Sequence, residues 1–146
     1  MNRTLEGGCQ CGSVRYKYAS EVLNIFVCHC IECQKQTGSA CAMGLWVQES
    51  GLQRLRGTLR HWMRRLPSGQ NMICEFCDQC GTRMYHTSDS NKTKGIVSIK
   101  PGTLDDTTWL QPRAHIWTCR AQPWMRIDPE QRQYLRNPPD LSSLDD

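Results

Sequence analysis

Ten cysteines among 146 residues carry the clearest chemical signal of the sequence, because several of them stand at the short spacings that metal sites use. Residues 8–12 (GCQCG) hold a Cys-x-Cys pair, and residues 77–81 (CDQCG) hold a Cys-x-x-Cys-Gly knuckle. In either spacing both sulfurs can point the same way, and the flanking glycines allow a tight turn. A structural zinc ion needs four ligands, so we predict that the two pairs close one site. Its ligands would be Cys9, Cys11, Cys77 and Cys80.

A third group of cysteines is denser, because residues 28–33 (CHCIEC) carry three thiols within six positions. Three ligands leave the fourth tetrahedral position open, which is typical of a catalytic zinc, since substrate or water can enter there. We therefore predict a second metal site held by Cys28, Cys30 and Cys33. A fourth protein ligand would close this site instead. The sequence offers Cys41, Cys74, Cys119 and His29 for that place.

The rest of the composition fits a small protein that needs such cross-links. Leu, Ile, Val and Phe together number 26, about 18% of the chain, which is a thin aliphatic core. The first residues (MNRTLEGG) lack the apolar run of an export signal, so we expect a cytoplasmic protein, in which reducing conditions favour metal over disulfides. No stretch approaches the roughly 18 consecutive apolar residues of a membrane span, so no membrane contact is expected.

Many short strands would position the cysteines. Gly, Pro and Cys divide the chain into segments of strand length, and no long amphipathic helix interrupts them. We predict a single, mainly β domain over residues 1–146, built from antiparallel strands, with a tail that frays from about residue 138. One helical turn at residues 31–37 should end at Gly38. The expected strands are residues 13–18, 23–28, 41–48, 52–55, 59–64, 72–77, 83–86, 96–99 and 115–119.

Several further motifs follow one another along the chain, namely residues 8–16 (GCQCGSVRY), 28–40 (CHCIECQKQTGSA), 76–82 (FCDQCGT), 102–106 (GTLDD), 115–117 (HIW) and 123–124 (PW). In this order they resemble the glutathione-dependent formaldehyde-activating enzyme family, and the likeness runs from about residue 7 to residue 134. Cys41 and Cys119 depart from the family pattern, in which an aromatic residue and a small polar residue are expected.

The resemblance implies an Mss4-like fold, a β-tent of curved antiparallel sheets stapled by zinc. Cys9, Cys11, Cys77 and Cys80 match the family's structural tetrad, and Cys28, Cys30 and Cys33 match its catalytic trio. The family reaction adds the glutathione thiol to formaldehyde, giving S-(hydroxymethyl)glutathione, and its reverse makes the enzyme a carbon-sulfur lyase. The expected cofactor is Zn²⁺, and the expected partners are glutathione and a small aldehyde. The oligomeric state stays open, with a homo-oligomer as one option.

The charge of the predicted trio site suggests how it would work. Zinc held by three thiolates carries a formal charge of −1, which weakens its Lewis acidity. Such a site suits the placing of a thiolate beside an aldehyde better than the generation of hydroxide. Glutathione also carries two carboxylates, so its pocket should present cations. Lys35 and Arg83 stand nearest to the cysteine motifs in sequence and are our candidates.

Two other functions compete with this one. Zinc knuckles also build nucleic-acid or protein-binding modules, and residues 52–65 concentrate five arginines around Trp62 in what we expect to be a solvated hairpin. The formal charge argues against nucleic acid, because seven thiolates and two Zn²⁺ ions would lower it by three, from +4 to +1. The second alternative is a thiol redox enzyme resembling methionine sulfoxide reductase B, with Cys119 as its reactive thiol.

Overall fold

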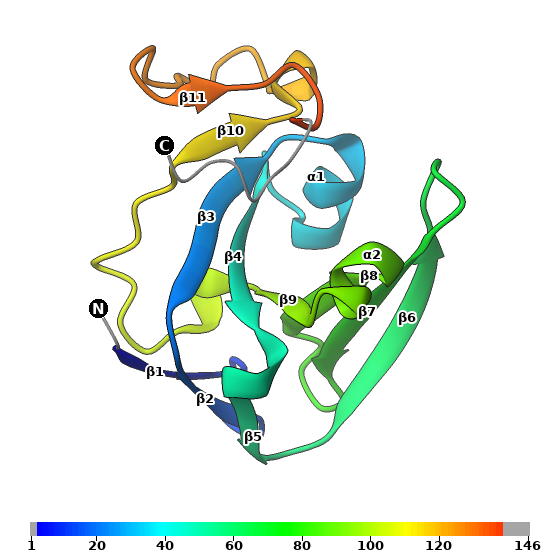
Figure 1. Ribbon diagram of the computed structural model, residues 1–146, viewed down its shortest axis with the longest axis vertical. Coiled ribbons are helices and arrows are strands. Elements are labelled where there is room, and N and C mark those ends of the chain that lie inside the picture. The colour runs from blue at the N-terminus through cyan, green and yellow to red at the C-terminus, as the bar shows by residue number, and fades with distance from the viewer. Residues whose placement is uncertain (1–2, 139–146) are drawn as a thin grey trace.

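The computed structural model describes residues 3–138 of the chain. Its strands form a three-stranded sheet in the order β1-β2-β5 and an eight-stranded sheet in the order β11-β10-β3-β4-β9-β8-β7-β6 (Figure 1). The strands are β1 (Thr4–Gly8), β2 (Arg15–Ala19), β3 (Val22–Cys28), β4 (Ala42–Gln48), β5 (Leu52–Arg56), β6 (Leu59–Arg65), β7 (Asn71–Cys77), β8 (Arg83–Ser88), β9 (Ile96–Ile99), β10 (Ala114–Ile116) and β11 (Arg132–Gln133). The helices are α1 (Ile31–Thr37) and α2 (Asp89–Thr93), with 3-10 turns η1 (Glu49–Gly51), η2 (Pro101–Thr103) and η3 (Thr118–Arg120). The predicted mainly β class with curved sheets is confirmed.

The main core lies between the two sheets, and the alternation of β2 explains how it forms. Tyr16 and Tyr18 point inward and are fully buried, whereas Arg15 and Lys17 stay partly exposed. The ring of Tyr16 packs edge-on against Tyr85 of the larger sheet, with 5.5 Å between the ring centroids. Buried aromatic rings supply apolar area that the scarce aliphatic residues do not. The other fully buried side chains of this core are Val14, Leu45, Val47, Cys77, Met84 and Ile99.

The helix predicted at residues 31–37 is present as α1, and both of its ends are capped. At the start, the Cys30 sulfur accepts a hydrogen bond from the Cys33 backbone N–H. At the end, Gly38 adopts the left-handed conformation with φ 64° and donates its N–H to the Gln34 carbonyl. A seven-residue helix is too short to be stable alone. Gln34 also anchors it to the C-terminal part of the chain, since its side-chain amide donates to the Arg120 carbonyl at 3.0 Å.

The hairpin expected for residues 52–65 does not form. β5 pairs with β2 in the smaller sheet, and β6 pairs with β7 in the larger one. Gly57 separates the two strands with φ 89°, a conformation that glycine adopts without strain, and the chain changes sheets there. The arginines of this segment therefore do not lie on one paired ribbon, which removes the geometry that a phosphate-tracking strand pair needs.

The strand expected at residues 115–119 is also wrong in its second half. Only His115 and Ile116 belong to β10, because Trp117 has φ 57° and η3 follows it. The backbone N–H groups of Thr118 and Cys119 bond instead to the carbonyls of residues 134 and 135. β10 also runs parallel to both β3 and β11, an exception to the otherwise antiparallel pairing.

Three elements go beyond the sequence prediction, namely β1, α2 and β11. The sequence of β1 ends in two glycines and does not indicate a strand, yet β1 pairs with β2 along its whole length. The tail that we expected to fray lies outside the described residues, apart from Pro138. Within residues 3–138, no helix is long and apolar enough to cross a membrane.

Candidate metal centres

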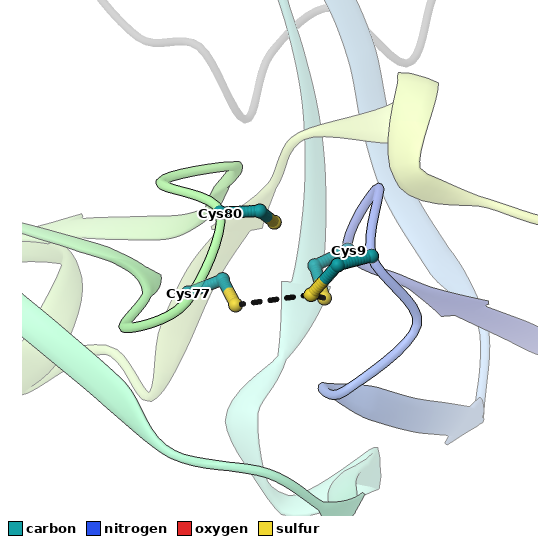
Figure 2. Close-up of side chains that lie close together, drawn as sticks. Cys9, Cys77 and Cys80 are labelled. Atoms are coloured by element: carbon teal, nitrogen blue, oxygen red, sulfur yellow. Dashed lines mark hydrogen bonds between the residues drawn. The ribbon is translucent and has the colours of Figure 1, made fainter.

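Two turns that lie far apart in the sequence bring four cysteine sulfurs together, since Cys11 and Cys77 are separated by 66 positions. Cys9 and Cys11 lie in the turn between β1 and β2, while Cys77 ends β7 and Cys80 lies in the turn before β8. The four sulfurs all lie within 4.8 Å of one another. Figure 2 shows Cys77 and Cys80 on one turn, facing Cys9 on the other. We call this group the four-cysteine cluster.

The spacing of these sulfurs fits a tetrahedral zinc ion. Zn–S bonds of about 2.3 Å at tetrahedral angles require sulfurs about 3.8 Å apart. The Cys9 and Cys11 sulfurs are separated by 3.5 Å, and those of Cys11 and Cys77 by 3.9 Å. Each turn closes on a glycine with positive φ, Gly12 at 77° and Gly81 at 73°, whose N–H donates to the carbonyl of the first cysteine in its pair. Both halves of the cluster are therefore tight turns closed by a glycine, the first over three positions and the second over four.

Hydrogen bonds prepare two of these thiols for metal. Burial raises the pKa of Cys9, but hydrogen bonds from the Val14 backbone N–H and from Ser13 outweigh it and lower the pKa to about 7. The hydrogen bond with the Thr82 hydroxyl, 3.1 Å from the Cys80 sulfur, lowers the pKa of Cys80 to about 5. Since the thiolate is the form that binds zinc, the protein itself stabilises part of the ligand charge.

The second group, which we call the three-cysteine cluster, gathers where β3 passes into α1. Cys28 is the last residue of β3, Cys30 is the N-cap of α1, and Cys33 lies in the first turn of the helix. Their sulfurs also lie within 4.8 Å of one another. Hydrogen bonds from the Cys28 and Cys33 thiols lower the pKa of Cys30, and the Cys33 backbone N–H adds to the effect. Three converging cysteine sulfurs form a donor set that suits zinc.

None of the candidate fourth ligands joins this cluster in residues 3–138. Cys41, Cys74 and Cys119 lie outside the group of sulfurs that meet within 4.8 Å, and so does His29. His29 is fully buried and points elsewhere, because its Nε2 lies 2.8 Å from Nδ1 of His115. Nε2 of His115 in turn lies 3.0 Å from the Gln131 side-chain oxygen. No fourth ligand atom from residues 3–138 therefore joins the three sulfurs.

Arg83 and Lys35, the two cations expected to hold glutathione, differ in their surroundings. Lys35 is exposed in the last turn of α1. The Arg83 guanidinium lies over the rings of Trp62 and Phe76, 5.9 and 5.6 Å from their centroids, and its Nη1 is buried without a hydrogen-bond partner in the described chain. Arg83 also interacts electrostatically with Lys100. A carboxylate-binding role for Lys35 and Arg83 stays a prediction.

One functional candidate escaped the sequence reasoning. Lys100, which follows β9, is only 8% exposed, and its Nζ is buried with no hydrogen-bond acceptor among residues 3–138. It interacts electrostatically with Cys33 and Cys28. A buried lysine that interacts with two of the three cluster thiols suits a metal site with excess negative charge, so this environment also fits a bound zinc ion. A single lysine after a short apolar run gives no signal of this burial in the sequence.

Comparisons with known proteins agree with this architecture. A family model described as glutathione-dependent formaldehyde-activating enzyme matches residues 4–120. Among solved structures, the chain is similar to a crystal structure of a Rhodobacter sphaeroides protein at 20% sequence identity and a TM-score of 0.54, over 88% of this chain and 98% of that one. That likeness supports the fold. No curated protein matches the chain. Because the family model spans most of the sequence and includes both cysteine clusters, the chain belongs to the glutathione-dependent formaldehyde-activating enzyme family.

Proposed function

We propose that this protein adds the thiol of glutathione to formaldehyde, or to a related small aldehyde, at a zinc ion held by Cys28, Cys30 and Cys33. The observation that carries the proposal is the three-cysteine cluster, whose sulfurs converge while no fourth ligand from residues 3–138 joins them. Family membership supports the choice of glutathione and formaldehyde. In the opposite direction the same reaction is that of a carbon-sulfur lyase.

The reaction forms one C–S bond and breaks the carbonyl π bond, and the thiol proton ends on the former carbonyl oxygen. Zinc bound at the cluster would supply a positive centre that keeps a thiol ionised at neutral pH. The protein chain contributes by holding the cysteines of the cluster in place. Cys28 is fixed by pairing of β3 with β4 and with β10, and Cys30 is fixed as the helix cap. Two small molecules brought together beside a rigid cluster react with a smaller loss of translational freedom.

The four-cysteine cluster would play a different part. It joins the turn after β1 to the turn after β7, and so connects the smaller sheet to the larger one. With all four tetrahedral positions taken by protein sulfurs, a zinc ion there has no place for substrate, so we assign it a structural role.

The test compares Cys30→Ser with Cys119→Ser on the full zinc-loaded chain. Exchange NMR would measure the interconversion of formaldehyde plus glutathione with their adduct, above the rate without protein. We expect Cys30→Ser to lose about one zinc per chain and to return the rate to the uncatalysed level. Cys119 is exposed and outside both clusters, so Cys119→Ser should keep zinc and rate.

Two results would contradict the proposal. If Cys30→Ser keeps both its zinc content and its rate, the three-cysteine cluster has no catalytic role. If Cys119→Ser abolishes activity instead, the redox alternative becomes the better account.

A further inference from the structure

Lys100 occupies a position in which an ammonium group is strongly disfavoured unless something compensates it. It is the residue between β9 and η2, and its backbone is held on both sides. Its N–H donates to the Met84 carbonyl at 2.8 Å, and its carbonyl accepts from the Thr103 N–H at 2.9 Å and from the Thr103 hydroxyl at 2.7 Å. These backbone hydrogen bonds fix the position of the Lys100 Cα, and the side-chain Nζ is buried. Burial lowers the pKa of Lys100, as desolvation does for any buried cation.

The groups around Lys100 include thiols and another cation. The sulfurs that interact with it favourably are those of Cys33, Cys74 and Cys28, two of which belong to the three-cysteine cluster. Arg83 opposes it with a like charge. No ion pair within residues 3–138 joins Lys100 to a carboxylate. The negative charge that could compensate this ammonium therefore comes from thiolates.

With zinc bound, all three cysteines of the cluster are thiolates, because the thiolate is the form that binds the metal. Three thiolates on one Zn²⁺ ion leave a formal charge of −1 beside the ammonium. We propose that Lys100 is the internal counter-ion of the three-cysteine site, offsetting the net negative charge that three thiolates leave on a bound zinc ion. This inference rests on the proposed function, because it requires metal at that cluster.

The charge of Lys100 also affects a thiolate that enters the fourth coordination position of the bound zinc. Without Lys100, an incoming glutathione thiolate would approach a centre of charge −1 in a poorly solvated place. With Lys100, the zinc, the three thiolates and the ammonium sum to zero, so an anionic sulfur meets no net repulsion. Lys100 is thus a positioning residue that acts on both the metal and the thiolate that joins it.

The experiment measures the zinc affinity of the full chain by competition with a chromophoric chelator. Lys100→Met should weaken one of the two zinc sites by about 10- to 100-fold, the range seen when a residue supporting metal ligands is lost. The other site should keep its affinity, because Cys33, Cys74 and Cys28, the cysteines that interact most strongly with Lys100, lie outside the four-cysteine cluster. Lys94→Met, at an exposed lysine on the same segment of chain, is the matched control and should change neither site.

A second variant separates charge from packing. Lys100→Arg keeps the charge and changes the shape, so it should restore most of the lost affinity, whereas a purely structural lysine would not be rescued by a bulkier guanidinium. Lys100→Gln removes the charge with a polar side chain and serves if Lys100→Met does not fold.

The outcomes distinguish this inference from the proposed function. If the unmodified chain binds two zinc ions and Lys100→Met and Lys100→Gln bind both as tightly, the counter-ion role is overturned while the proposed function stands. If the unmodified chain binds a single zinc ion at the four-cysteine cluster, the proposed function fails and this inference falls with it. Equal loss in Lys100→Arg and Lys100→Met would also overturn the role of charge.

Discussion

Replacement of Cys77 by alanine should abolish cooperative folding, whereas the same replacement at Cys74 should cost only local packing. The two residues form a matched pair, since both are thiols of β7 and both are buried, with exposed fractions of 1% and 5%. Alanine removes the same sulfur from each. Only Cys77 belongs to the four-cysteine cluster. The difference between the two variants therefore isolates what the cluster contributes.

The two variants should lose very different amounts of the free energy of unfolding. Deleting the Cys74 sulfur removes one buried apolar atom, which costs about 1–2 kcal/mol of the free energy of unfolding. Cys11 and Cys77 are 66 residues apart, and a cross-link over that length lowers the entropy of the unfolded chain by about 4 kcal/mol. Structural zinc sites contribute about 10–16 kcal/mol in total, against a net stability of about 5–15 kcal/mol for ordinary domains. Losing Cys77 should therefore cost at least the cross-link contribution and leave little stability.

The assay is urea unfolding followed by circular dichroism, with zinc content measured on the same samples. We expect Cys74→Ala to keep its zinc and a cooperative transition at slightly lower urea. Cys77→Ala should lose about one zinc per chain and unfold without a sharp transition, and chelator treatment of the unmodified protein should reproduce that behaviour. Equal losses in the two variants, or a transition that chelator does not change, would refute the reasoning that the cluster holds the two sheets together.

Three further predictions concern the frame around the clusters. Leu45→Ala removes a fully buried side chain from the main core and should lower the free energy of unfolding by about 2–5 kcal/mol in a denaturant titration. Asp105→Asn breaks the pair with Arg15, whose guanidinium donates to the carboxylate at 2.8 Å and lowers the pKa of Asp105. Because folding lowers this pKa, the pair stabilises the protein above about pH 4, by less than about 1 kcal/mol at this exposed site, and the contribution disappears as the pH falls. The melting temperatures of the variant and the unmodified protein should therefore converge in acid. Gly57→Ala forces a side chain into a left-handed conformation with its Cβ 2.5 Å from the Ser13 carbonyl oxygen, so thermal melting should show a loss of more than about 1 kcal/mol.

The cysteine spacings predicted more of the structure than any strand pattern did. Within each pair, two sulfurs on one tight turn follow from local geometry, which the sequence encodes directly. That the pairs meet across 66 residues follows only from the ligand number of zinc, yet the structure brings all four sulfurs together. The assignment of zinc to these clusters stays a prediction.

Features that depend on how the sheets curve could not be predicted in the same way. Residues 52–65 contain two segments of strand length with Gly57 between them, as a hairpin would, and nothing local shows that the chain enters another sheet at Gly57. Lys100 stands after a short apolar run, and the sequence offers no reason to bury it, because the groups that interact with it come from α1, β3, β7 and β8. Contacts between residues far apart in the sequence determine both the path of the chain at Gly57 and the burial of Lys100.

His29 shows how the fold holds the three-cysteine cluster from two sides. Cys28 and Cys30 flank it, and because it turns away from their sulfurs its ring reaches His115 on β10, stacking with 5.2 Å between centroids. Its backbone N–H donates to the Ile116 carbonyl, so the same residue is anchored twice to β10. The parallel pairing of β10 with β3 thus helps to fix His29, the residue between the candidate ligands Cys28 and Cys30. A cluster held in this way keeps its three sulfurs converging without a fourth ligand from residues 3–138, and an open coordination position would require that condition.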